Sequence, residues 1–197
     1  MNIKNATLVC LLATLSGCAS YAPPKINDKT GFYETITNLD EAAIRTRNTD
    51  VNLGKYRFVH LVSETNVYPG RFEFFTRAAL AKNGFTRVLN TDELTELIAS
   101  NSRFSSIQSI SDPVSLRRLA ELFGPILQIR FSSRWDGDVR RYVTMTITDL
   151  TTGEQLLHIY HSKLIWSDVD AEAHYPVLNE FKKWADACSA KNEGKKI

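Results

Sequence analysis

Residues 142–166 read YVTMTITDLTTGEQLLHIYHSKLIW, and the periodicity of this stretch decides the fold. In its first part apolar residues alternate with polar ones, which is typical of a strand with one buried face. The alternating apolar residues are Val143, Met145 and Ile147. Residues 151–154 then reverse the chain, with Gly153 supplying the positive φ of a bulged hairpin, and residues 156–166 return as a long strand. The stretch therefore predicts an antiparallel hairpin.

The residues upstream predict further strands. Residues 126–134 predict a strand, and Asp136-Gly137-Asp138 follow it. Asp and Gly are the expected residues of a hairpin turn, so a turn is favoured over a cation or sugar contact there. Residues 56–62 are an apolar, β-rich run suited to an inner strand, and residues 85–89 form a shorter one. Together with the hairpin they predict a mixed sheet whose second half is an antiparallel meander.

Helix signals separate and follow these strands. One helix begins at Pro69 and ends at Asn83-Gly84. Two more begin at caps, one at Asn90 with a glutamate three residues later and one at Asp112. A last helix begins at Pro176. The predicted order is β-α-β-α-α-β-β-β-α, which is a single α/β (α+β) domain with a three-layer-like arrangement.

This order and its hairpin turn carry a resemblance to a known group of proteins. The matching residues are Asp149, Thr152, Gly153, Glu154 and Ser162-Lys163. Over residues 55–190 the chain resembles the periplasmic α/β domain shared by curli-secretion lipoproteins, lipoprotein activators of penicillin-binding proteins and the amino-terminal domain of TolB. The resemblance implies a fold and a periplasmic setting rather than an activity. The chain lacks the extra amphipathic strands of a curli-type channel, so pore formation is not expected.

The beginning of the chain has the pattern of a secretory signal. A basic start at Lys4 precedes an apolar run over residues 6–15, shorter than the ~20 residues that span a bilayer. The run ends in Leu15-Ser16-Gly17-Cys18, which resembles the lipobox of bacterial lipoproteins. In that family the chain is cut between the residues that match Gly17 and Cys18, and the cysteine is acylated, as with palmitate. An ordinary signal peptide with an incidental cysteine is the alternative.

These motifs divide the chain into four parts. Residues 1–17 are the predicted signal peptide, residues 18–54 the lipidated cysteine with its tether and lead-in, residues 55–190 the periplasmic domain, and residues 191–197 a basic tail. No aspartate follows Cys18, which by analogy with enterobacterial sorting favours the outer membrane over retention in the inner membrane. The acyl chains on Cys18 are thus expected to hold the domain on the membrane, facing the periplasm.

Composition narrows the function classes. Removal of residues 1–17 leaves 180 residues with 23 basic and 22 acidic side chains, enough for one domain with a real core. A nearly neutral chain without a basic stripe argues against a nucleic-acid-binding protein.

The cysteines offer no disulfide within the mature chain. Cys10 leaves with the signal and Cys18 is consumed by lipid, so Cys188 alone remains. Its spacing from Leu178, Phe181 and Ala185 predicts the buried face of a helix. Pairing with another molecule is the alternative.

The histidines suggest no metal site. His158 and His161 lie three residues apart on one predicted strand, so their side chains point to opposite faces and cannot easily share an ion. His60 lies inside an apolar strand and is expected to be a hydrogen-bonded core or edge residue. We expect no metal and no cofactor.

The acidic segment before the last helix is the remaining cation candidate. Asp168, Asp170, Glu172 and His174 lie close together, but their spacing does not match a calcium loop, and a solvated linker is favoured. No nucleophile elbow, phosphate-binding loop or zincin helix occurs. A Ser-His-Asp set assembled in space is not singled out by sequence, so no catalytic residue is named.

Two tryptophans mark a possible contact surface. Trp135 lies at a predicted turn and Trp166 at a strand end, where large rings often anchor a partner. Arg134, Arg140 and Arg141 flank the same hairpin and would add a polar rim. The alternative is that each tryptophan covers the rim of the core.

The sequence thus favours a non-enzymatic lipoprotein of the outer membrane that works through contact with an envelope protein. A peptidoglycan- or small-molecule-binding module is the second hypothesis, and a pocket lined by Trp and Arg would favour it. A hydrolase is the third, and it needs a concave site with a hydrogen-bonded Ser-His pair or paired carboxylates.

Overall fold

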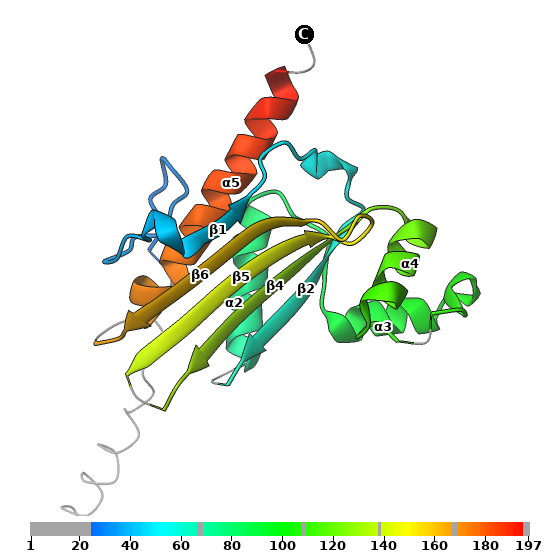
Figure 1. Cartoon of the computed structure of the whole chain (residues 1–197), viewed down its shortest axis with the longest axis horizontal. Helices are drawn as coiled ribbons and strands as arrows, with labels where there is room; N and C mark the ends of the chain where they lie inside the picture. The colour runs from blue at the N-terminus through cyan, green and yellow to red at the C-terminus, as the bar shows by residue number, and fades with distance from the viewer. Residues whose placement is uncertain (1–24, 67–68, 108, 138, 167–168, 195–197) are drawn as a thin grey trace, which may run out of the picture.

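The computed structural model describes residues 25–66, 69–107, 109–137, 139–166 and 169–194 (Figure 1). The strands are β1 (Ile44–Arg47), β2 (Phe58–Thr65), β3 (Val88–Leu89), β4 (Ile126–Trp135), β5 (Arg140–Asp149) and β6 (Gln155–Leu164). The helices are α2 (Pro69–Lys82), α3 (Thr91–Ala99), α4 (Pro113–Phe123) and α5 (Tyr175–Gly194), and a π-helical turn, Asp170–His174, precedes α5. The predicted signal peptide, Cys18, Asp138 and Asp168 lie outside these residues.

The strands form one mixed sheet in the order β1-β6-β5-β4-β2-β3. β2 runs parallel to β3 and β4, whereas β4, β5, β6 and β1 pair antiparallel. In this register Ile147 lies opposite Ile129 on one side and Leu157 on the other. The predicted α/β fold, with a meander in its second half, is confirmed.

One face of the sheet is covered by α2 and α5 (Figure 1). Every second residue of β5, from Arg141 to Asp149, is buried on this inner face. Trp184 of α5 is fully buried, and its indole N–H donates a 2.7 Å hydrogen bond to the carbonyl of Asn48. The largest buried side chains of this core come from both layers, and include Phe131, Met145, Phe181 and Trp184.

Among the described residues, the other face is covered only at one end, where β2 and β4 begin. There α3 and α4 pack a second apolar cluster against the sheet through Leu94, Leu116 and Leu119. The sheet contributes Phe58 and Ile126 to this cluster. The third layer of the predicted three-layer-like arrangement is therefore partial, and the rest of this face remains open.

The lead-in segment joins the domain. β1 adds an edge strand to β6, which the sequence pattern does not predict because its Ile-Arg-Thr-Arg run is short and has three polar residues out of four. Tyr33 is buried, and its backbone exchanges two hydrogen bonds with the side-chain amide of Asn179 on α5. These contacts tie residues ahead of the predicted boundary at residue 55 to the sheet and to α5.

The β5–β6 hairpin is fastened by Asp149. This buried carboxylate accepts hydrogen bonds from the backbone N–H of Thr151 (2.8 Å), the ammonium of Lys55 (2.8 Å) and the hydroxyl of Tyr56 (3.0 Å). Burial alone would raise the pKa of Asp149, but these donors outweigh it and hold that pKa below its usual range. Gly153 adopts φ 77°, as predicted. Asp149 and Gly153, two of the residues that carry the family resemblance, thus have a structural role here.

Other predictions divide into confirmed and wrong ones. Cys188 is buried on α5, as predicted, and the capping box at Asn90 is present. The strand predicted over residues 85–89 is reduced to Val88–Leu89, and a 3₁₀ turn, Ser102–Phe104, lies between α3 and α4. None of the helices in the described ranges is long and apolar enough to cross a membrane.

The solvated linker predicted before Pro176 is wrong. The chain is already helical at Val169, and Glu172 and His174 are 4% and 3% exposed. Pro176 lacks the N–H that would bond the carbonyl of Glu172 in an α-helix. His161 of β6 lies 3.2 Å from that oxygen through Nε2, so the sheet supplies the missing donor.

Candidate functional site

The part of the sheet that α3 and α4 leave uncovered forms a polar surface, which we call the open face. It consists of the outward side chains of five strands. They are Arg45 and Thr46 on β1, Val62 and Glu64 on β2, Arg130, Ser132 and Arg134 on β4, Arg140, Tyr142, Thr144, Thr146 and Thr148 on β5, and His158, Tyr160 and Ser162 on β6. The opposite residues of the same strands form the core.

The open face is aromatic and positively charged. The rings of Tyr142 and Tyr160 lie with centroids 6.3 Å apart, and the guanidinium of Arg45 lies 4.8 Å from the centre of the Tyr160 ring. Three more arginines lie on this face, at positions 130, 134 and 140. Glu64 neutralises part of this charge through a 2.9 Å ion pair with Arg130. The four arginines outnumber this one carboxylate, so the open face carries net positive charge.

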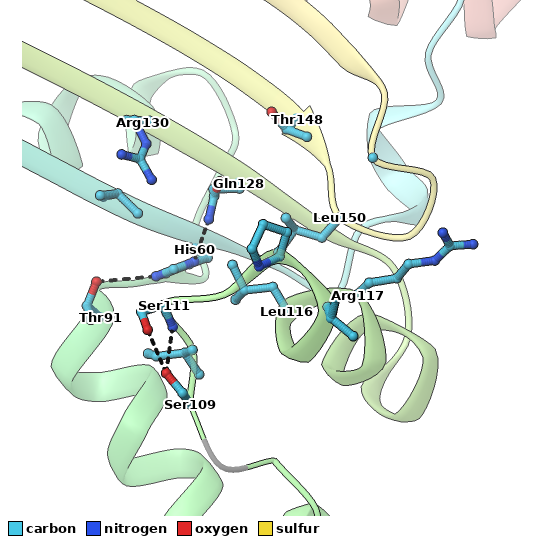
Figure 2. A pocket seen from close by; sticks show the side chains of 15 residues that line it. His60, Thr91, Ser109, Ser111, Leu116, Arg117, Gln128, Arg130, Thr148 and Leu150 are labelled. Atoms are coloured by element: carbon cyan, nitrogen blue, oxygen red, sulfur yellow. Dashed lines mark hydrogen bonds between the residues drawn. The ribbon is translucent and has the colours of Figure 1, made fainter.

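A pocket of about 790 Å³ opens at the end of the open face, between the sheet and α4 (Figure 2). We call it the His60 pocket. Its sheet wall includes His60, Gln128 and Thr148, and its helical wall includes Leu116. The volume lies within the range of small-molecule and side-chain binding sites.

His60 is held by two neighbours in this pocket. The amide nitrogen of Gln128 lies 3.2 Å from Nδ1, and the hydroxyl of Thr91 lies 3.4 Å from Nε2 (Figure 2). Burial, together with the charge of Arg130, lowers the pKa of His60 to about 4. The ring is therefore neutral at neutral pH and offers hydrogen bonds without charge. Its placement agrees with the predicted hydrogen-bonded core histidine.

A second hollow, of about 530 Å³, lies at the other end of the open face. Tyr142, Thr144 and Tyr160 line it, together with Glu64 and Arg134. The two hollows lie on one face of the sheet and at different points along β5, so an extended molecule that runs along β5 reaches both.

The residues predicted to contact a partner do not all lie on the same face of the sheet. Arg134 is exposed on the open face, with Arg140 half-buried beside the hairpin turn. Trp166 is 76% exposed after β6. Trp135 is half-buried and packs against the core, which agrees with the alternative that it covers the rim.

Arg141 is placed on the inner face, so it forms no part of an exposed rim. It is 3% exposed, and its guanidinium lies 5.0 Å from the centre of the Trp135 ring. Burial lowers the pKa of Arg141, an effect that the charge of Asp170 opposes. Its Nε donates to the hydroxyl of Ser133 (2.7 Å), whereas its Nη1 has no hydrogen-bond partner among the described residues.

Ser133 belongs to a buried polar chain that the sequence does not reveal. Its hydroxyl lies 2.6 Å from Nε2 of His174, and Nδ1 of His174 lies 2.7 Å from a carboxylate oxygen of Asp170. This is the bonding order of a Ser-His-Asp triad. However, Ser133 has no exposed surface, so no substrate reaches its hydroxyl in this structure. This buried polar chain of hydrogen bonds joins β4 to the start of α5.

The remaining histidines lie as predicted on opposite faces of β6. His158 is half-buried on the outer side, 3.0 Å from the hydroxyl of Thr146, and His161 is buried on the inner side. Within the described ranges, no group of three or more His, Cys, Asp or Glu residues is placed to hold a metal ion.

No protein-family model matches the sequence, and no curated protein matches it. Among solved structures, the chain is similar to the C-terminal domain of LpoB from Escherichia coli, at 18% identity and a TM-score of 0.38 over 57% of this chain and 87% of that one. It is also similar to the PelC dodecamer from Paraburkholderia phytofirmans, at 13% identity and a TM-score of 0.37 over 66% and 89% of the two chains. A lipoprotein from Neisseria meningitidis gives 17% identity and a TM-score of 0.34 over 55% and 81%. The function of the chain is therefore argued from its own residues.

Proposed function

We propose that the chain is a lipid-anchored protein on the periplasmic side of the outer membrane that acts through protein–protein contacts in the assembly or maintenance of the cell envelope. The lipobox at Leu15–Cys18 supports the anchor and the compartment. The open face is the observation that carries the contact role. The identity of the partner is left to experiment.

The open face has the composition of a recognition surface. An antiparallel sheet tolerates water on one side, so exposure of this face is compatible with folding. Tyrosine and arginine are the residues enriched where proteins bind one another. Here Tyr142 and Tyr160 lie between Arg45 and Arg140 on neighbouring strands, and the threonines of β5 add hydrogen-bonding groups. A protein partner would gain aromatic contact area and charge pairing at once.

A catalytic role is not part of the proposal. A Ser-His-Asp hydrolase needs its serine at the surface of a concave site. Ser133 is sealed within the core, its hydroxyl already accepts a hydrogen bond from Arg141, and the His60 pocket lies on the opposite face of the sheet.

A small-molecule- or peptidoglycan-binding module is the second candidate. The size of the His60 pocket favours it, and Arg117 and Arg130 lie at its walls. No tryptophan is among the residues that line the pocket, so the expected combination of Trp and Arg is only half met.

Site-specific photocrosslinking in intact cells tests the proposed contact role. We would place a photoreactive phenylalanine analogue at Tyr142 or Tyr160 on the open face. Phe74 on α2 is the matched control, because it is an aromatic residue that is 76% exposed and α2 packs on the opposite face of the sheet.

The proposal expects a discrete protein adduct at both tyrosines and none at Phe74, with the same partner identified by mass spectrometry at the two positions. Absence of adducts at Tyr142 and Tyr160, in a chain that is folded and membrane-bound, would refute it. Equal adducts at Phe74 would also refute it, because they would show contact without a preferred face.

A further inference from the structure

We propose that the His60 pocket is the anchoring site for one large apolar side chain of an acidic, extended partner segment that lies across the open face. This inference rests on the proposed function and names what the partner must present. It follows from the continuity of pocket and face, the two unlike walls of the pocket, and the charge around it.

The pocket and the open face are one continuous surface. Arg130 and Thr148 belong to the outward rows of β4 and β5, and both also line the pocket. Thr144 lies four residues from Thr148 on the same strand and the same side, and it lines the second hollow. A polypeptide lying over the open face therefore meets the pocket mouth at the end of β5.

Apolar side chains line part of the pocket. Val114 and Leu116 come from α4, Leu150 from the turn after β5 and Val62 from β2, and Leu116 and Leu150 are 6% and 8% exposed. Val114 at the rim is 77% exposed and adds an apolar side chain to the pocket mouth. A leucine- or phenylalanine-sized group entering here would remove its own apolar surface and that of Val114 from water, which is favourable in proportion to the area buried.

The sheet wall offers neutral hydrogen-bonding groups. Gln128 has its amide nitrogen on His60, and Thr148 makes no side-chain hydrogen bond within the described ranges (Figure 2). Such groups suit the N–H and C=O groups of a peptide main chain. Burial and the charge of Arg130 lower the pKa of His60, so positive charge is disfavoured at this wall, and a lysine side chain would lose its hydration without gaining a partner there.

The charges around the pocket indicate what flanks the apolar residue. Arg45, Arg134 and Arg140 line the path across the open face, and acidic residues on the partner would pair with them. Inside the pocket, Arg130 is already engaged by Glu64 at 2.9 Å. A free small anion would therefore find no unpaired cation on the sheet wall, which favours a side chain held by its own polypeptide.

The test measures the binding of defined peptides to the purified protein. Residues 25–197 are used if circular dichroism and a cooperative thermal transition show that this piece folds. If it does not fold, the full chain in detergent is used. The probes are fluorescein-labelled peptides of alternating glutamate and serine whose central residue is leucine, phenylalanine, alanine or lysine. Affinity is measured by fluorescence polarisation. We expect the leucine and phenylalanine peptides to bind about tenfold or more tightly than the alanine and lysine peptides.

Two matched variants locate the effect. Thr148→Trp fills the pocket, and Thr144→Trp makes the same substitution on the same strand outside it. The preference for leucine over alanine should disappear in Thr148→Trp and persist in Thr144→Trp. Val114→Asp, at an exposed position, should weaken every acidic peptide severalfold without threatening the fold, and it serves if Thr148→Trp does not fold.

Three outcomes would overturn the inference: equal binding of the leucine and alanine peptides, a preference that survives in Thr148→Trp, or tight binding of free octanoate that is lost in Thr148→Trp but displaces no peptide. The last would identify a small amphiphile as the occupant. Crosslinking separates this failure from failure of the proposed function. If the adduct at Tyr142 persists in Thr148→Trp, the anchoring role is wrong while the contact role stands; if Tyr142 gives no adduct in the unmodified chain, the contact role itself is wrong.

Discussion

Ser133 on β4 and His174 before α5, 41 residues apart in sequence, are joined by a buried 2.6 Å hydrogen bond between Oγ and Nε2. The carboxylate of Asp170 accepts from Nδ1 of the same ring, so Nδ1 carries a proton. Ser133 accepts in turn from Nε of Arg141. The four residues fasten β4 and β5 to the start of α5.

Ser133→Ala should lower the free energy of unfolding by about 1–3 kcal/mol, because it leaves Nε of Arg141 and Nε2 of His174 buried without this partner. Urea denaturation followed by circular dichroism measures the change. Ser132→Ala, one residue away and on the outer face, is the control and should stay within about 0.5 kcal/mol of the unsubstituted protein. Equal stability of the two variants would show that the polar chain does not hold the helix.

The same serine should be inert toward a fluorophosphonate probe. These reagents label serines that are both activated and accessible, and Ser133 has no exposed surface. Incubation of the folded protein followed by mass spectrometry checks this. Labelling that is lost in Ser133→Ala would establish an accessible nucleophile and would contradict the non-enzymatic proposal.

The sequence reveals much of the fold but little of this polar chain. The two-residue alternation in β5 and the caps of α3 and α4 are local signals, and each was readable because its residues act on near neighbours. The buried state of His174 depends on long-range packing instead. The acidic residues around it indicate a solvated linker, whereas the structure forms a helix there, in which Nε2 of His161 bonds the carbonyl of Glu172 that the N–H-less Pro176 cannot reach.

The open face was equally hidden. The alternation around Tyr142 and Thr144 shows that one side of β5 is buried, but it does not show how far α3 and α4 cover the other side. Arg141 is a different case. Sequence proximity alone groups it with Arg134 and Arg140 at the rim of the hairpin. Strand alternation places Arg141 on the inner side and the other two on the outer, and that signal could have separated them.

Asp149→Asn should destabilise the protein by about 1–3 kcal/mol, because the buried amide keeps the shape of the carboxylate but loses its charge-assisted bonds to Lys55 and Tyr56. Chemical denaturation at neutral pH measures the loss. Glu121→Gln removes a carboxylate from an exposed pair with Arg117 and should change stability by less than about 0.5 kcal/mol. An equal effect of the two substitutions would mean that Asp149 does not fasten the hairpin.

Cys18→Ser should abolish acylation and release the protein from the membrane fraction, because no other membrane attachment is expected from the sequence. Labelling with an alkyne-bearing palmitate analogue and cell fractionation measure the two effects. Cys188→Ser is the matched control, since that thiol is buried on α5. Retention of the Cys18→Ser variant in the membrane would rule out lipid as the anchor.

His60 should make the stability of the domain depend on pH between about 6.5 and 4. Its pKa in the folded protein is about 4, against 6.5 for an unperturbed histidine, so in this window the unfolded chain binds a proton that the folded chain refuses. The stabilisation is complete above pH 6.5 and is lost as the pH falls toward 4, by roughly 3 kcal/mol at most.

Urea denaturation at several pH values should show this decline in the unsubstituted protein and a shallower one in His60→Gln. His158→Gln, at a half-buried position on the open face, should flatten the decline less. Desolvation also lowers the pKa of His158, but this side chain is less buried than that of His60. If His60→Gln follows the same pH profile as the unsubstituted protein, His60 is not kept neutral by its pocket, and the uncharged wall assigned to that pocket would have to be abandoned.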